Sequence, residues 1–305
     1  MRQIIILLIA LLIQQDIKAC DQCNVVLGSG AISEGHFIGY RLRYRRQFQN
    51  VDLGKSSIHS KHLEHFQANG EIKELYTAHE LYGNYHIGKN WHLSLAIPFL
   101  NNYRSLNTTT VHDIYGIGDP WVMLRKQESW KNEKDHLFVS GGLGFKFPLG
   151  STSAEDGDTY VDLDMQPGTG SMDYLANLVL LYEYRKVFVM SQNTGKLNGS
   201  SPDDFRYGNN LSTSLLLGSR VINKGEDAWR LSFTGGIYSE FIGRDEVNGE
   251  KKGDISSTYF MDGGAVLRFK SMIVTANGQI PFITKVDSRQ LPTTHRFILN
   301  LQYEI

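Results

Sequence analysis

Most of the chain consists of segments in which apolar and polar side chains alternate, separated by gaps that are long and short in turn. A strand with lipid on one face and a wet lumen on the other must alternate in this way. A closed barrel with turns at one rim and loops at the other must also alternate its connections. The pattern therefore predicts an all-β fold, a closed antiparallel transmembrane β-barrel.

The alternating segments number about twelve, an even count that places both ends of the barrel on the same side of the membrane. Short turns are expected on the periplasmic side, so the long gaps near 50–70 and 148–170 are predicted to be extracellular loops. The predicted strands cover residues 36–48, 72–87, a segment that begins at 91 and includes 99, 116–126, 136–147, 171–184, 186–198, 207–222, 229–243, 255–269, 272–284 and 293–305.

The first predicted strand carries Arg41, Arg43 and Arg45 on one face and apolar residues on the other. A charge in the middle of a lipid face costs roughly 2 to 4 kcal/mol, so we expect the arginines to point into the lumen. There they face Glu80 of the second strand, either as a structural charge ladder or as a strip that selects solutes. The other lumen-lining residues that alternation predicts include Lys146, Asp262, Arg268, Arg296 and Glu304.

A tight hairpin is predicted at Gly88-Lys89-Asn90, because Gly and Asn tolerate the positive φ that such turns require. Trp91 follows at once, and Trp229 follows another turn in the same way. Both indole rings are therefore expected at a rim of the membrane, where amphipathic aromatic side chains gather.

Composition narrows the class further. The 305 residues contain no internal stretch of the roughly 18 consecutive apolar residues that a spanning helix needs. With 31 basic and 32 acidic residues the net charge is −1, which gives no reason to expect nucleic acid as a partner. The 30 glycines, 15 tyrosines and 15 phenylalanines suit twisted strands with aromatic girdles.

The first nineteen residues have the parts of a secretory signal peptide. Arg2 precedes an apolar run from Ile4 to Ile13, and the small residue Ala19 offers a cleavage point. The expected organisation is thus a signal peptide at 1–19, a periplasmic segment at 20–35 and the barrel at 36–305.

Both cysteines lie at the start of the expected mature chain, as Cys20-Asp21-Gln22-Cys23. In an exported, oxidising compartment such a pair can form a small disulfide, stay as thiols, bind a soft metal or exchange with another thiol. Lipid attachment at Cys20 is a further alternative. Two cysteines alone cannot complete a tetrahedral metal site.

The first long loop contains His59, His62 and His65. On one or two helical turns these three imidazoles would share a face and could hold Cu²⁺ or Zn²⁺. The simpler alternative is a solvated loop whose histidines are incidental.

The second long loop is rich in carboxylates but lacks the Gly and closing Glu of an EF-hand at the required offsets. The favoured interpretation is an acidic rim that stays solvated or meets the divalent ions bridging lipopolysaccharide. The residues concerned are Glu155, Asp156, Asp158, Asp162 and Asp164.

His92 and Ser94 lie two apart and so share a face, as the base and nucleophile of a membrane phospholipase barrel would. Such an enzyme shows this pair to lipid, whereas here the apolar face is the opposite one. Polar packing in the lumen is therefore the preferred interpretation.

Several short motifs resemble the outer-membrane barrels grouped with the meta-pathway phenol-degradation transporters, in the branch with an N-terminal Cys-x-x-Cys motif. The resemblance implies passage or binding of small compounds at the outer membrane, with no catalytic residues. The motifs are residues 35–45 behind Cys-Asp-Gln-Cys, Leu95-Ala96-Ile97-Pro98-Phe99, Gly116-Ile117-Gly118-Asp119-Pro120, Phe147-Pro148-Leu149-Gly150 and Gln166-Pro167-Gly168-Thr169-Gly170-Ser171.

The leading hypothesis is a non-enzymatic channel or uptake protein for small solutes in the outer membrane of a Gram-negative bacterium. Its expected partners are outer-membrane lipid, lipopolysaccharide, the barrel assembly machinery and the solute, and no cofactor is required. An alternative is an envelope protein that binds or senses Cu or Zn through Cys20, Cys23 and the histidine loop. A third hypothesis is a lipid-active barrel enzyme.

Overall fold

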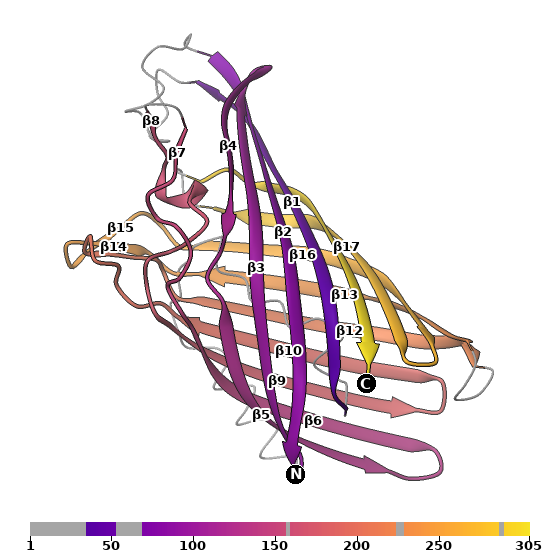
Figure 1. The fold of residues 1–305 in the computed structure, drawn as a ribbon. Coiled ribbons are helices and arrows are strands. Elements are labelled where there is room, and N and C mark those ends of the chain that lie inside the picture. Colours follow the sequence, from indigo (N-terminus) through magenta and orange to yellow (C-terminus); the bar gives the residue numbers. More distant parts are fainter. Residues whose placement is uncertain (1–34, 53–68, 157–158, 224–228, 287–289) are drawn as a thin grey trace.

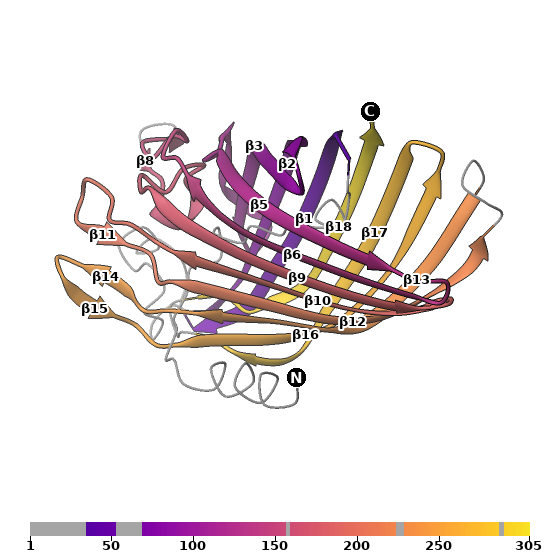
Figure 2. The same cartoon turned by 90° about the horizontal axis from the view of Figure 1, so that it is seen from below.

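A computed structural model describes residues 35–52, 69–156, 159–223, 229–286 and 290–305. Long antiparallel strands wrap around one axis and dominate the described chain (Figures 1 and 2). The strands of the main sheet are β1 (Phe37–Asp52), β2 (Asn69–Gly88), β3 (Trp91–Leu106), β4 (Thr109–Ile117), β5 (Trp121–Lys131), β6 (Asp135–Lys146), β9 (Asp173–Tyr184), β10 (Val187–Leu197), β12 (Asn210–Asn223), β13 (Trp229–Ile242), β16 (Ser256–Phe269), β17 (Met272–Lys285) and β18 (Thr293–Glu304).

The sheet closes on itself. β1 pairs with β2 on one side and with β18 on the other, where Phe37 lies opposite Glu304 and Tyr44 opposite Phe297. β2 also pairs with β3, so the ladder runs around the whole wall. Closure pairs the strands all the way round the barrel through β5, as a membrane-spanning sheet requires, whereas β4 pairs with β3 alone. The predicted closed antiparallel barrel is confirmed.

The predicted fourth strand is in fact two strands. β4 pairs with the outer part of β3, from Phe99 to Leu106, and β5 pairs with its first part, from Trp91 to Ala96. β4 and β5 together occupy one of the twelve strand positions of the barrel, and this position is interrupted at Gly118-Asp119-Pro120. The prediction of a single strand at 116–126 was wrong, since it missed the whole segment from Thr109 to Tyr115.

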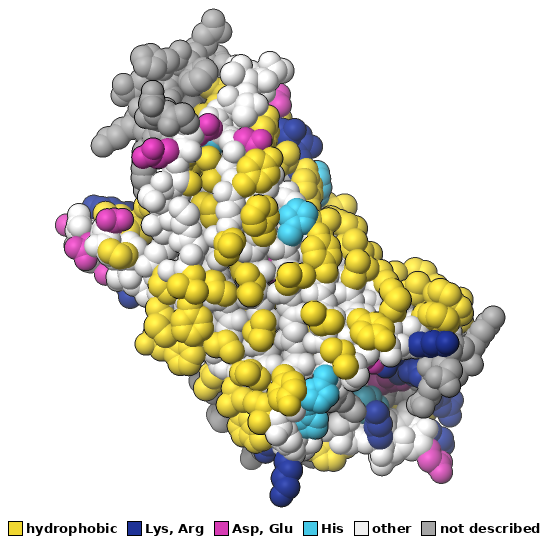
Figure 3. Space-filling view, in the orientation of Figure 1, with side chains coloured by type: hydrophobic (Ala, Val, Ile, Leu, Met, Phe, Trp, Pro, Cys, Tyr) yellow, Lys and Arg dark blue, Asp and Glu magenta, His cyan; other side chains and the backbone are white. Residues whose placement is uncertain are grey.

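Alternation of the two faces follows the sequence prediction. On β1, Arg41 and Arg45 are buried toward the lumen, whereas Ile38 is exposed on the outer wall. On β9, Asp173 to Tyr184, inward residues are all buried and outward residues all exposed. Hydrophobic side chains accordingly form the broad band that covers the strands in Figure 3, with charged side chains toward its ends.

Short turns join the strands at one end of the barrel. Lys89 and Asn90 both adopt positive φ, at 39° and 70°, between β2 and β3, as the hairpin prediction required. Arg185 and Lys270 adopt positive φ in the turns that join β9 to β10 and β16 to β17. Trp91 begins the strand after the first of these turns and Trp229 begins β13, and both are exposed.

The other end carries the long connections, and these contain structure that the sequence prediction left as loops. Residues 147–172 include β7 (Glu155–Asp156), β8 (Thr159–Tyr160) and the 3₁₀ turn η3 (Leu163–Met165). Beyond β10 lie β11 (Phe205–Arg206), β14 (Asp245–Val247) and β15 (Glu250–Lys252), which pair as a small separate sheet. Within the described ranges no helix has the length and apolar character to cross a membrane.

Candidate functional site in the lumen

Ion pairs line one wall of the lumen. Arg41 Nη1 donates to Glu80 Oε2 at 3.1 Å, and Arg43 pairs with the other oxygen of the same carboxylate. The Arg41 Nε group also donates to Asn300 Oδ1 at 2.7 Å, which ties β1 to β18 as well as to β2. Arg41 and Arg43 thus share the Glu80 carboxylate, whereas the guanidinium of Arg45 lies over the ring of Tyr76.

The long connection between β6 and β9 folds over the outer end of the lumen. Arg104 of β3 holds it: Nη1 donates to Asp162 Oδ2 at 2.5 Å and Nη2 to Asp164 Oδ2 at 3.1 Å, on either side of Leu163. Arg104 Nε donates to Glu74 at 2.7 Å, so the guanidinium joins the wall to the loop. The side chains of Arg104 and Asp162 are each about nine-tenths buried.

Two backbone carbonyls of η3 are held by opposite sides of the barrel mouth. Asn102 Nδ2 of β3 donates to the carbonyl of Met165 at 3.0 Å. Tyr207, which precedes β12, donates its hydroxyl to the carbonyl of Leu163 at 2.9 Å. Met165 packs with Ile114 of β4 in a small apolar cluster. The connection therefore acts as an outer plug, defined here as residues 148–172.

A second network fixes both ends of the outer plug. Lys146 Nζ contacts Asp119 at 2.6 Å and Asp173 at 3.0 Å, and Lys196 Nζ contacts Asp173 at 3.4 Å. Asp119 also accepts hydrogen bonds from the backbone N–H groups of Gly150 and Thr169, each at 2.9 Å. The interruption between β4 and β5 therefore supplies the carboxylate that holds the plug against the wall.

Close backbone contact explains two glycines of the plug. A Cβ atom on Gly168 would lie 2.3 Å from the carbonyl oxygen of Gly150, which no side chain could tolerate. The Gly168 N–H donates to the Ser151 carbonyl at 2.7 Å, so the two ends of the plug run against each other.

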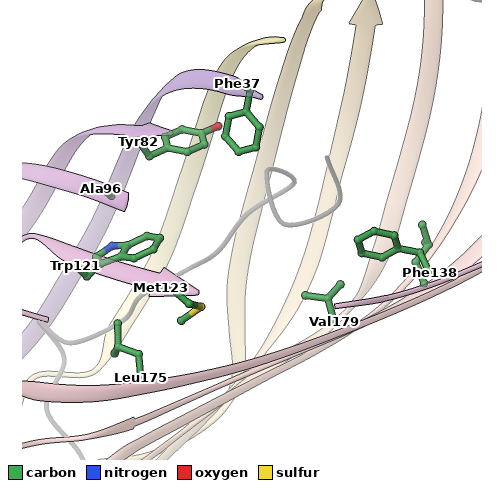
Figure 4. Close-up of a cluster of buried hydrophobic side chains, with 9 residues drawn as sticks. Phe37, Tyr82, Ala96, Trp121, Met123, Phe138, Leu175 and Val179 are labelled. Carbon is green, nitrogen blue, oxygen red and sulfur yellow. The ribbon is translucent and has the colours of Figure 1, made fainter. Parts of the chain in front are cut away.

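Below the plug, aromatic and aliphatic side chains from β1, β2, β3, β5, β6 and β9 point into the lumen. Figure 4 shows Phe37 and Tyr82 together on one side and Phe138 and Val179 on the other. Phe188 and Met190 of β10 pack against this cluster. The members of this apolar cluster are Phe37, Tyr82, Ala96, Trp121, Met123, Phe138, Leu175, Val179 and Leu181.

A cavity of about 300 Å³ occupies the lumen beside β9 to β18, toward the short-turn end. Apolar residues such as Leu181, Phe188, Met190, Leu216 and Ile298 line it among polar ones. On β18, for example, the polar Asn300 lies nearer the short-turn end than the apolar Ile298, and the short-turn end itself carries ion pairs. The polar lining includes Gln192, Thr194, Ser212, Ser214, Asp262, Thr275, Asn277, Gln279 and Asn300, and the charged end has Glu183, Arg220, Arg230, Arg268 and Glu304.

The predicted lumen residues all lie on inward-facing positions, but they do not form one site. Lys146 belongs to the plug network, and Arg296 pairs with Glu240 at 2.5 Å through Nη2. Asp262 and Arg268 line the cavity, where Gln279 Nε2 donates to Asp262 Oδ2 at 2.7 Å and Arg268 pairs with Glu304. Arg41, Arg43, Arg45 and Glu80 stay on the first wall.

Two interpretations of polar residues have an outcome. The expectation of a solvated acidic rim was wrong for Asp162, which is buried against Arg104, whereas Asp164 also binds Arg104 but keeps 37% of its side chain exposed. His92 and Ser94 are buried on the inward face of β3, where Ser94 Oγ donates to Asn84 Oδ1 at 2.9 Å.

The proposed metal ligands Cys20, Cys23, His59, His62 and His65 lie outside the described residues. Among the residues that are described, no group of three or more His, Cys, Asp or Glu side chains could hold a metal ion. Sequence reasoning also missed Asp173, Glu240 and Arg125 as buried lumen charges, although the alternation of their strands would have placed them inward.

Residues 61–296 match the family described as "Putative MetA-pathway of phenol degradation". The chain belongs to this family. The predicted resemblance is thereby confirmed over most of the barrel, whereas no curated protein matches the chain.

One solved structure agrees with the fold. The chain is similar to the COG4313 outer membrane channel from Pseudomonas putida F1, with a TM-score of 0.66 and 12% identity over 92% of this chain and 100% of that one. It is also similar to the β domain of the Bordetella autotransporter BrkA, with a TM-score of 0.46 and 10% identity over 89% of this chain and 100% of that one. The chain therefore has the barrel fold of an outer-membrane channel.

Proposed function

We propose that this protein is a non-enzymatic channel or uptake protein that passes small, partly apolar solutes across the outer membrane of a Gram-negative bacterium. The observation that carries the proposal is the cavity in the lumen, which is lined by apolar and polar side chains together and has ion pairs at its short-turn end. Concave sites with apolar walls and a few convergent polar groups are typical of small-molecule binding. The similarity to an outer membrane channel and the phenol-degradation family support the same conclusion.

The outer plug is the basis for proposing that the pathway is gated. Buried ion pairs close the lumen on the extracellular side, whereas the cavity lies toward the short-turn, periplasmic side. A solute from outside must therefore displace part of residues 148–172 before it reaches the cavity. This arrangement favours a narrow, gated channel over a wide general pore.

The remaining expectations on processing and surroundings belong to the same proposal. Residues 1–19 act as a signal peptide, residues 20–35 lie in the periplasm, and the barrel assembly machinery inserts 36–305. The hydrophobic band of Figure 3 then contacts outer-membrane lipid and lipopolysaccharide.

Filling the cavity tests the proposal. Leu216 lines the cavity, and its neighbour Leu217 is 60% exposed on the outer wall of the same strand. In planar lipid bilayers, Leu216→Trp should reduce the single-channel conductance by about half, since it narrows a side-chain-lined pathway. Leu217→Trp is the matched control and should conduct as the unmodified protein does. A folded protein that never conducts, or equal currents in both variants, would contradict the proposal.

A further inference from the structure

Cations inside the barrel are generally paired with carboxylates. Arg104, Lys146 and Arg296, for example, all form ion pairs within the lumen. Arg125 of β5 is different. Its side chain points inward and the residue is only 1% exposed, yet no carboxylate among the described residues forms an ion pair with it. Burial of an unpaired charge is costly, so the position indicates a negatively charged partner that is not part of the described chain.

The guanidinium is held in place but incompletely bonded. Arg125 Nη2 donates to Asn84 Oδ1 at 2.8 Å, whereas Nε and Nη1 have no hydrogen-bond partner within the described structure. Gly142 lies opposite Arg125 on β6, and a Cβ there would be 2.5 Å from Arg125 Cγ. The glycine thus leaves room for the arginine stem along the sheet, which orients the unpartnered Nε and Nη1.

Neighbouring polar groups are also unsatisfied. Gln127 lies two residues along the same face, opposite Ser140 of β6, and both are buried. In the described structure, the amide of Gln127 and the hydroxyl of Ser140 have no hydrogen-bond partner. On the other side of Arg125 lies His92, whose ring stacks on His86 with centroids 4.7 Å apart. Several unused donors therefore gather around one cation, the pattern of an oxyanion site.

The surroundings of this donor group are apolar. Met123 precedes Arg125 on the same inward face, and Phe138 precedes Ser140, and both belong to the apolar cluster of Figure 4. That cluster shares Leu181 with the cavity wall. A ligand held here would contact Arg125 through its charge and the cluster through its body.

We propose that Arg125, Gln127 and Ser140 form a binding site for a small organic carboxylate with an apolar body. The positive charge of Arg125 favours an anion over a hydroxyl or amine solute, and its unpartnered Nη1, with the amide of Gln127 and the hydroxyl of Ser140, can donate to carboxylate oxygens. The inference rests on the proposed function, since it assigns a solute class to the same lumen.

The next residue in the chain supplies a matched control. Lys126 points to the outer wall, its side chain is 54% exposed, and it lies 3.3 Å from Glu128. Arg125→Gln and Lys126→Gln therefore remove one positive charge each from adjacent positions, but only the first faces the lumen.

The test is calorimetric titration of the purified, folded full-length protein in detergent with benzoate, phenol, benzylamine and inorganic phosphate. Benzoate should bind, and Arg125→Gln should weaken it about tenfold, the loss expected for a charge-assisted hydrogen-bonded pair. Lys126→Gln should bind as the unmodified protein does, and Arg125→Lys should recover part of the affinity. Heat-dependent mobility in gels checks that each variant is folded.

Equal benzoate affinity in Arg125→Gln and the unmodified protein, or no benzoate binding at all, would overturn the site. Phosphate binding as tight as benzoate binding would overturn the role of the apolar body. Conductance in potassium chloride is recorded separately. A protein that conducts but ignores benzoate loses this site and keeps the proposed channel, whereas one that binds benzoate without conducting loses the channel and keeps the site.

Discussion

The two ends of the lumen solve the problem of buried charge differently. At the outer end, the fully buried Asp173 forms ion pairs with both Lys146 and Lys196. Arg104 forms ion pairs with three carboxylates. At the short-turn end, Glu183 and Arg220 form a simple pair in which the arginine side chain is 29% exposed. A closed end requires every polar group to be satisfied internally, whereas a water-accessible end does not. The comparison separates a long-connection end, whose ion pairs are deeply buried, from a short-turn end, called the vestibule, whose Glu183–Arg220 pair is partly exposed.

The largest effect is expected at Asp173. Asp173→Asn leaves Lys146 and Lys196 buried with one carboxylate fewer, and removing one partner of such a group typically costs about 3 to 5 kcal/mol. Guanidinium unfolding in detergent micelles measures the free energy of unfolding. Asp113→Asn, at an exposed outward position of β4, should change it little. Similar losses in the two variants would show that the outer end is not specially dependent on its ion pairs.

Release of the outer plug comes next. Arg104→Ala removes the contacts to Asp162 and Asp164, so residues 148–172 should leave the lumen more often and the mean conductance should rise roughly twofold or more. Arg185→Ala, in the short turn between β9 and β10, provides the control. Unchanged currents in Arg104→Ala would mean that the plug is not the barrier.

The smallest effect is expected at the vestibule. Glu183→Gln leaves Arg220 without its partner, but this partly exposed pair should contribute less than about 1 kcal/mol to stability. The extra positive charge should shift the reversal potential in a salt gradient toward anion selectivity. Glu133→Gln, exposed in the turn before β6, should not. A stability loss as large as that of Asp173→Asn would erase the distinction between the two ends.

The alternation predicted the barrel because every second side chain of a membrane-spanning strand contacts lipid and must be apolar. Strand residues beyond the lipid are not under this constraint. The segment Thr109 to Tyr115 carries Asp113 on its outer face, where Asn101 Nδ2 donates to it at 2.8 Å. A strand with water on both faces has no such pattern, which is why most of β4 was missed.

The site was less predictable for a different reason. Asp162 finds Arg104 across 58 residues of chain, and no local pattern in an acidic loop reveals so distant a partner. Arg125 and Lys126 are adjacent cations, so one of them must face outward. Because Lys126 lies near the rim, where a charge on the lipid face costs little, the sequence does not decide which of the two faces the lumen. The inward row opposite Glu80 was easier, because three arginines at every second position allow only one orientation.

The pairing of β1 with β18 joins residues that are far apart in the chain, such as Phe37 and Glu304. Until the last strand has been synthesised, β1 and β17 both carry unpaired backbone groups, which invite pairing with other chains. The polypeptide must therefore be kept from aggregating along its whole journey to the membrane, and its slowest folding step is expected to be this most distant contact.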